Sequence, residues 1–105
     1  MLVSYTIGDE FEPAHTETYD LGLGGLAMLS EVELALDSAL TFELELRGDP
    51  RPPLRLAGEV RWCRHDPLLE KYRIGVEFTQ RSPEQEALLV GYIDTMVKLR
   101  DLGVL

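Results

Sequence analysis

The sequence predicts an all-β domain with one helix: a small six-stranded antiparallel β-barrel that a C-terminal α-helix caps. Three segments between residues 40 and 78 alternate apolar and polar side chains with a period of two, as half-buried strands do. Short antiparallel strands at close spacing are typical of small barrels. The last segment repeats its apolar side chains with a period of 3.6, which predicts a helix over about 83–102. The length of 105 residues fits one domain, 1–105.

The first half predicts three strands of less regular pattern. Residues 3–7 alternate apolar and polar side chains, and Gly8-Asp9-Glu10 is typical of a turn. The stretch from Phe11 to Asp20 is rich in Thr, Tyr and Phe, which favours a second strand. Residues 26–29 predict a third short strand, and residues 30–38 predict a connection that contains a helical turn.

The chain from residue 40 onward predicts three longer strands, over residues 40–46, 54–63 and 72–78. Gly48-Asp49-Pro50 is typical of a loop, so the first two of these strands are expected to form a hairpin. In the middle strand the apolar alternation continues through Val60 to Trp62. It therefore predicts that Trp62 lies in the core, with Arg61 and Cys63 on the outer face.

The predicted helix has clear signals at both ends. Ser82 is a good N-cap, Pro83 suits the first helical position, and Gln85 completes a capping box. The apolar stripe consists of Leu88, Leu89, Tyr92, Ile93, Met96 and Leu99. Val90 and Val97 lie to one side of it, where we expect them to widen the core-facing surface; the alternative is a stripe that binds a partner.

Acidic residues dominate the first half of the chain. Residues 1–50 hold eleven Asp and Glu and one base, Arg47, and the whole chain has a formal net charge of -9. Duplex nucleic acids and anionic membrane surfaces both attract Lys and Arg, so neither partner fits this half. No apolar run approaches the roughly 20 residues that span a bilayer, and the first residues lack the basic segment of a signal peptide. We therefore expect a cytoplasmic protein without nucleic-acid binding or membrane insertion.

Few residues suit catalysis or metal binding. Cys63 is the only cysteine, which excludes an intrachain disulfide, and with two histidines it does not supply a structural zinc site. Cys63 and His65 share one face of a predicted strand, but no orienting acid accompanies them. We expect neither a metal site nor catalytic residues, so the chain is not expected to be an enzyme, and His15 is expected to be an ordinary surface histidine.

The segment Asp20-Leu21-Gly22-Leu23-Gly24-Gly25 holds three glycines in four positions. It fits either a tight turn between strands or a phosphate cradle of exposed backbone N–H groups. No G-K-[ST] follows, so it is not a P-loop. The tight turn is the favoured interpretation, and it predicts a positive φ at one or more of Gly22, Gly24 and Gly25.

Three motifs in order resemble a PilZ domain. They are D-L-G-L-G-G-L at residues 20–26, G-E-V-R-W at residues 58–62 and Y-R-I-G-V-E-F at residues 72–78, followed by the terminal helix. The resemblance covers nearly the whole chain from Val3 onward. It implies a six-stranded antiparallel barrel with a C-terminal helix, and it points to a family in which many members are bacterial receptors for cyclic di-GMP.

The resemblance also implies where the nucleotide would bind. In the family an R-x-x-x-R segment precedes the first strand, and a [D/N]-x-S-x-x-G element on the barrel contacts a guanine and the phosphates. Asp20, Gly22 and Gly25 occupy the second element, with Gly22 in the place of the serine. The first element is missing, because no arginine precedes Arg47. Losing two or three charge-assisted hydrogen bonds of roughly 1.5–3 kcal/mol each removes several decades of affinity.

We therefore expect no cofactor and no cyclic di-GMP binding by the usual mode. Family members without the arginine motif are adaptors in motility and type IV pilus biogenesis, so the resemblance implies a protein partner, either a pilus-assembly ATPase or a signalling protein. The acidic half offers a surface for a basic partner. The alternative is a cyclic di-GMP receptor with an altered motif, using Asp20, the glycines and later arginines. Acids interleave with Arg61, Arg64, Arg73 and Arg81, which favours solvated strand faces over a second basic site.

Overall fold

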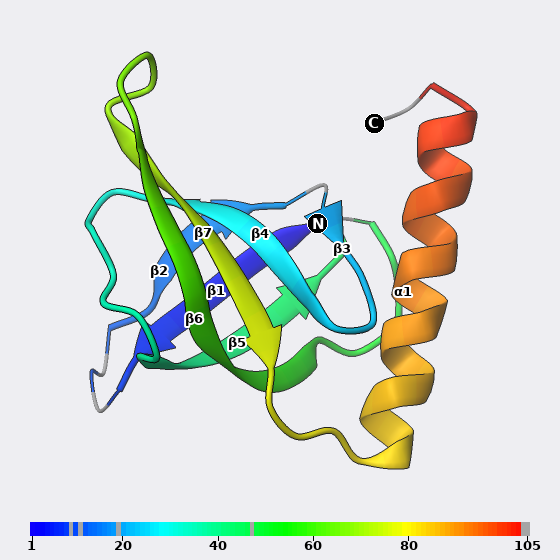
Figure 1. The fold of residues 1–105 in the computed structure, drawn as a ribbon. Coiled ribbons are helices and arrows are strands. Elements are labelled where there is room, and N and C mark those ends of the chain that lie inside the picture. Colours follow the sequence, from blue (N-terminus) through cyan, green and yellow to red (C-terminus); the bar gives the residue numbers. More distant parts are fainter. Residues whose placement is uncertain (9, 11, 19, 47, 104–105) are drawn as a thin grey trace.

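The computed structural model describes residues 1–8, 10, 12–18, 20–46 and 48–103, and it shows one curled antiparallel sheet with a helix beside it (Figure 1). The strands are β1 (Leu2–Ile7), β2 (Ala14–Glu17), β3 (Asp20–Leu21), β4 (Gly25–Ser30), β5 (Ala39–Glu45), β6 (Leu54–Asp66) and β7 (Lys71–Phe78), and the helix is α1 (Pro83–Asp101). Their order in the sheet is β2-β1-β5-β6-β7-β4-β3. The predicted class, an antiparallel barrel-like sheet followed by one helix, is confirmed, although the sheet is a half-barrel with seven strands instead of six.

The additional strand arises because the predicted second strand is two strands. Thr18 interrupts it and is buried; its Oγ1 donates a hydrogen bond to the Ala27 carbonyl at 2.5 Å and accepts one from the Asp20 N–H at 3.1 Å. The Thr18 N–H also donates to the Met1 carbonyl at 3.0 Å. Thr18 therefore connects the β1–β2 edge of the sheet to the β3–β4 edge and helps to close the curl. Asp9 and Phe11, which the prediction placed in the preceding turn and strand, lie outside the described residues.

The inner face of the curled sheet forms the core, as the alternating patterns predicted. Its buried side chains come from β1, β4, β5, β6 and β7, and the largest that are fully covered include Phe42, Leu40, Leu44, Leu54 and Ile74. Phe42 and Phe78 meet edge to face, with ring centroids 6.3 Å apart. Leu89, Tyr92 and Met96 of α1, which stands beside the curled sheet (Figure 1), join this core. The outer face of the sheet is therefore left for other contacts.

Trp62 is not in the core, and the prediction that placed it there is wrong. Val60 pairs with Val76, but Trp62 pairs with Gly75, because a β-bulge between Val60 and Trp62 inserts one extra residue. One inserted residue moves every later side chain of the strand to the opposite face. Trp62 is consequently 39% exposed on the outer face, and Cys63, predicted to face outward, instead packs against the edge of the core.

The helix begins and ends close to the predicted positions. Ser82 and Gln85 form the capping box, and Leu89, Tyr92 and Met96 are buried. Val90 and Val97 are exposed, so the expectation that they widen the core face is wrong. At 3.6 residues per turn, Val90 lies about 100° around the helix axis from the buried Leu89, and Val97 lies about 100° from the buried Met96. Both valines are therefore outside the stripe of the helix that packs against the core.

The loop between β5 and β6 holds the helix in place. The Tyr92 hydroxyl donates to the Pro52 carbonyl at 2.7 Å, and the Arg51 guanidinium lies 4.5 Å from the centroid of the Tyr92 ring. Arg51 also donates to the Thr95 hydroxyl at 2.8 Å and pairs with Asp49 at 2.6 Å. No helix in the described part of the chain is long and apolar enough to cross a membrane.

Candidate functional site

The glycine segment forms the hairpin between β3 and β4 and is tied to β7. Asp20 pairs with Ala27 and Leu21 with Leu26, while the Gly22 N–H donates to the Gly25 carbonyl at 2.9 Å. The Gly24 carbonyl accepts a hydrogen bond from the Phe78 N–H at 2.8 Å. These bonds fix the turn at one end of the outer face, beside the last residues of β7.

The predicted positive φ does not occur at Gly22, Gly24 or Gly25; among the described residues, the glycines with positive φ are Gly8, Gly48 and Gly103. The prediction is wrong because glycine has a second use, the close approach of two backbones. A Cβ on Gly25 would overlap the Val76 carbonyl of the neighbouring strand β7. Gly24 has open space around its Cα, so no steric demand is placed on that position.

Trp62 lies beside the glycine turn, on the outer face. Its indole rests directly on Gly75, where any Cβ would overlap the ring. Two open hollows flank the indole. One of about 540 Å³ includes Asp20, Gly22, Gly25, Arg61, Trp62 and Glu77, and the other, of about 410 Å³, includes Asp20, Thr16, Glu17, Trp62 and Arg73. The three residues of the predicted element, Asp20, Gly22 and Gly25, therefore share one surface with Trp62, which the sequence reasoning had assigned to the core.

Arg61 is the cation nearest to this turn, and carboxylates surround it. Its Nη1 lies 2.9 Å from both Asp37 Oδ1 and Glu59 Oε2, and its Nε lies 3.2 Å from Glu77 Oε2. The hydrogen bonds that Arg61 donates to Glu77 and Glu59 raise its pKa. The guanidinium is thus already shared among three acids, and Asp20 lies in the same hollow. A phosphate would meet a surface on which negative charge exceeds positive charge.

The other arginines are arranged differently. Arg73 Nε lies 3.0 Å from Asp66 Oδ2, and Arg64 lies over the Trp62 ring at 5.4 Å from the centroid. Arg64 makes no ion pair with the described residues. Arg81 lines neither hollow. The structure brings three of the four arginines to one face of the hairpin, but two of them are engaged with acids.

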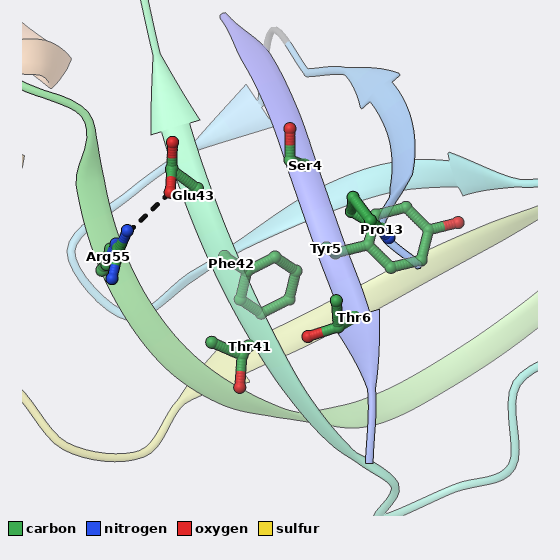
Figure 2. A pocket seen from close by; sticks show the side chains of 8 residues that line it. All are labelled: Ser4, Tyr5, Thr6, Pro13, Thr41, Phe42, Glu43 and Arg55. Carbon is green, nitrogen blue, oxygen red and sulfur yellow. Dashed lines mark ion pairs between the residues drawn. The ribbon is translucent and has the colours of Figure 1, made fainter. Parts of the chain in front are cut away.

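Another hollow lies on the outside of β1, β5 and β6 (Figure 2). It encloses about 290 Å³ and combines hydroxyls with one ion pair, Glu43 to Arg55 at 3.3 Å. On the adjacent strand the exposed His15 lies with its Nδ1 3.1 Å from the Ser4 Oγ, and on β6 the His65 ring packs against Tyr72 at 5.2 Å. Among the described residues there is no group of three or more side chains that could hold a metal ion.

The comparison with known families decides what this fold is. A PilZ domain model matches residues 1–95 of the chain. The chain belongs to the PilZ domain family. Among solved structures it is similar to the Bacillus subtilis Inhibitor of motility (MotI/DgrA), with a TM-score of 0.72 and 20% identity over 98% of this chain. The chain spans 48% of that protein, and at this identity the similarity shows a common fold. No curated protein matches the chain.

Proposed function

We propose that this PilZ domain is a non-catalytic cytoplasmic adaptor in motility or pilus signalling, and that it acts by binding another protein. The partner would be a pilus-assembly ATPase or a signalling protein. The domain would not bind cyclic di-GMP in the mode usual for the family. Support for a role in motility comes from the family and from a structural neighbour whose name is inhibitor of motility.

One observation carries the proposal. Among the described residues, the only cation that lines the hollow at the glycine turn is Arg61, and acids already neutralise it. Arg61 contacts Asp37, Glu59 and Glu77, while Gly22 lacks the hydroxyl that a serine would offer. A ligand with two phosphates needs charge-assisted hydrogen bonds, each worth about 1.5–3 kcal/mol. Without two or three of them the binding free energy weakens by roughly 5 kcal/mol, which raises the dissociation constant by more than three decades.

The test is calorimetric titration of cyclic di-GMP into the pure protein, with an arginine-containing PilZ domain as the positive control. We expect binding heat from the control and none from this chain. Binding with a dissociation constant in the low micromolar range or tighter would overturn the proposal. The variant E59Q/E77Q frees Arg61 from two carboxylates, so gain of weak binding in that variant alone would confirm that the acids neutralise the site.

The second candidate is a receptor with an altered motif, and the arrangement of Trp62 favours it. An exposed indole with Arg64 above it and Asp20 nearby offers a base a stacking surface and a cation. Trp62 is the only tryptophan, so tryptophan emission, excited selectively over that of the four tyrosines, reports on this surface. A receptor would show saturable quenching by cyclic di-GMP that Arg64→Ala weakens. An adaptor would show no change in emission with the nucleotide.

A further inference from the structure

We propose that the β6–β7 hairpin is the docking element of this domain and that it binds a protein with an acidic surface around an apolar pocket. We call its outer face and tip the hairpin finger, which consists of Trp62, Arg64, Leu68, Leu69, Lys71 and Arg73. The inference rests on the proposed adaptor function and names the surface that would perform it.

The tip of the finger presents apolar side chains to solvent. β6 continues past the bulge to Asp66, and Figure 1 shows the hairpin projecting beyond the rest of the sheet at the upper left, with α1 at the right of the view. Leu68 at the tip is 94% exposed and Leu69 is 47% exposed. Single exposed leucines are common. Two adjacent ones on a projecting hairpin can both enter the same pocket of a partner.

The tip is ordered by its own hydrogen bonds and does not depend on the core. Asp66 Oδ1 accepts from the Leu68 N–H at 3.0 Å and from the Leu69 N–H at 3.1 Å, and Asp66 Oδ2 accepts from Arg73 Nε at 3.0 Å. The Leu69 N–H and Arg73 lower the pKa of Asp66, so these bonds persist at neutral pH. Glu70 has a φ of 53°, a conformation uncommon for a residue with a side chain. A prearranged tip loses less conformational entropy on binding than a flexible one.

The outer face of the finger carries a cross-strand pair that weakens the sheet. Arg64 lies directly opposite Arg73, and like charges in that position are destabilising. Asp66 offsets the charge of Arg73, but Arg64 has no ion pair among the described residues. Lys71 adds a third cation, which among the described residues pairs with the exposed Glu31 at 3.3 Å, and such exposed pairs contribute little free energy. An acidic partner would relieve this repulsion.

The charge of the whole chain favours a protein over a lipid surface as that partner. Residues 62–73 carry three cations (Arg64, Lys71 and Arg73) and two acids (Asp66 and Glu70), a net charge of 3 - 2 = +1, whereas the whole chain has a net charge of -9. A membrane is wide and anionic, so it would repel the acidic body while it attracted the finger. A protein with a local acidic patch would attract the finger alone, and the charge asymmetry would orient the encounter. A second copy would need its acidic body to accept the finger, a head-to-tail contact that need not close.

Trp62 and Arg64 extend the surface toward the base of the finger. The guanidinium of Arg64 lies over the indole, and Trp and Arg are the residue types that most often dominate the free energy of protein association. The surface therefore contains an apolar tip, a basic middle and an aromatic base, all on the outer face of one hairpin.

The test begins with the wild-type chain immobilised and exposed to an extract of its native host. The protein it retains is identified and purified, and its affinity is measured for wild type, Leu68→Asp, Arg64→Glu and Leu102→Asp. Leu102 is 76% exposed at the far end of α1 and serves as the matched control. We expect Leu68→Asp and Arg64→Glu each to weaken binding at least tenfold, Leu102→Asp to leave it unchanged, and the wild-type affinity to fall with rising salt concentration.

Retention of an unidentified protein supports the inference only if Leu68→Asp and Arg64→Glu abolish it and Leu102→Asp does not. Equal affinities for wild type and Leu68→Asp would overturn the assignment of the hairpin finger as the docking element, while leaving the adaptor function intact. Cosedimentation with phosphatidylglycerol vesicles that Leu68→Asp abolishes would overturn it in favour of a membrane. A dimer in light scattering that Leu68→Asp dissociates would overturn it in favour of a second copy. No retained protein, together with cyclic di-GMP binding, would overturn the adaptor function itself.

Discussion

Three glycine-to-alanine variants separate the two reasons for which this chain uses glycine. At Gly25 the obstacle to a side chain is the backbone of β7, since the Val76 carbonyl occupies the place of a Cβ. At Gly75 the obstacle is the Trp62 indole, a side chain that is partly exposed and can swing outward. At Gly24 no heavy atom lies within 4 Å of an added Cβ. The predicted order of destabilisation is therefore Gly25→Ala, then Gly75→Ala, then Gly24→Ala.

The magnitudes follow from what must move. Gly25→Ala forces β4 away from β7, and overpacking of this kind destabilises by about 1–3 kcal/mol. Because the obstacle is backbone, which moves less readily than a side chain, we expect a destabilisation of about 3 kcal/mol. Gly75→Ala displaces a mobile ring and is expected near 1 kcal/mol. Gly24→Ala restricts the unfolded chain and is expected to be neutral or to stabilise by up to about 0.5 kcal/mol. For a chain of this size each 1 kcal/mol changes Tm by about 4 °C.

Urea denaturation gives the free energy of unfolding of each variant, and fluorescence of the single tryptophan reports on the outer face. Gly75→Ala is expected to shift the Trp62 emission to longer wavelength, because the displaced indole gains exposure to water. Gly24→Ala is expected to leave the emission unchanged. If Gly24→Ala destabilises as much as Gly25→Ala, the turn itself requires glycine and the reasoning from close backbone approach is refuted.

Two further predictions concern the closure of the sheet and the attachment of the helix. Thr18→Val leaves the Ala27 carbonyl and the Asp20 N–H without their partner and is expected to destabilise by about 1–3 kcal/mol in urea, whereas Thr18→Ser is expected to keep most of the stability. Hydrogen bonds from Arg51 lower the pKa of Asp49 from 3.8 to about 2. Because the folded value is the lower one, this contribution is present above pH 4 and disappears as the pH falls from about 4 to about 2. The Tm of Asp49→Asn is therefore expected to decline less over that interval than that of wild type, and parallel declines would contradict the assignment.

The elements that the sequence predicts well are those with local signals. The alternation of residues 40–46 and 72–78 and the capping box at Ser82 depend on neighbours within a few positions, and the structure confirms all of them. Asp20, Gly22 and Gly25 line one hollow because they belong to one hairpin; their role as binding residues stays a prediction.

The elements that the sequence misses depend on distant contacts. The bulge that turns Trp62 outward leaves no mark in a period-two pattern, and only its partner Gly75, a glycine within an apolar strand, signals that a large side chain lies there. The division of the strand at Thr18 depends on hydrogen bonds to Met1 and Ala27. In both cases the tertiary contact overrides a local preference.

The position of Arg61 explains why restoring one serine would not recreate the ligand site of the family. Arg61 lies on the outer face, where it connects the loop at Asp37 to β7 at Glu77 through ion pairs, so its charge stabilises the fold. Its carboxylate partners are held in place by the chain, and groups fixed in this way compete at a high effective concentration with any phosphate from solution. A serine at position 22 would add one neutral hydroxyl beside a guanidinium that remains occupied. We therefore expect that binding by the usual mode would require new arginines outside this ion network.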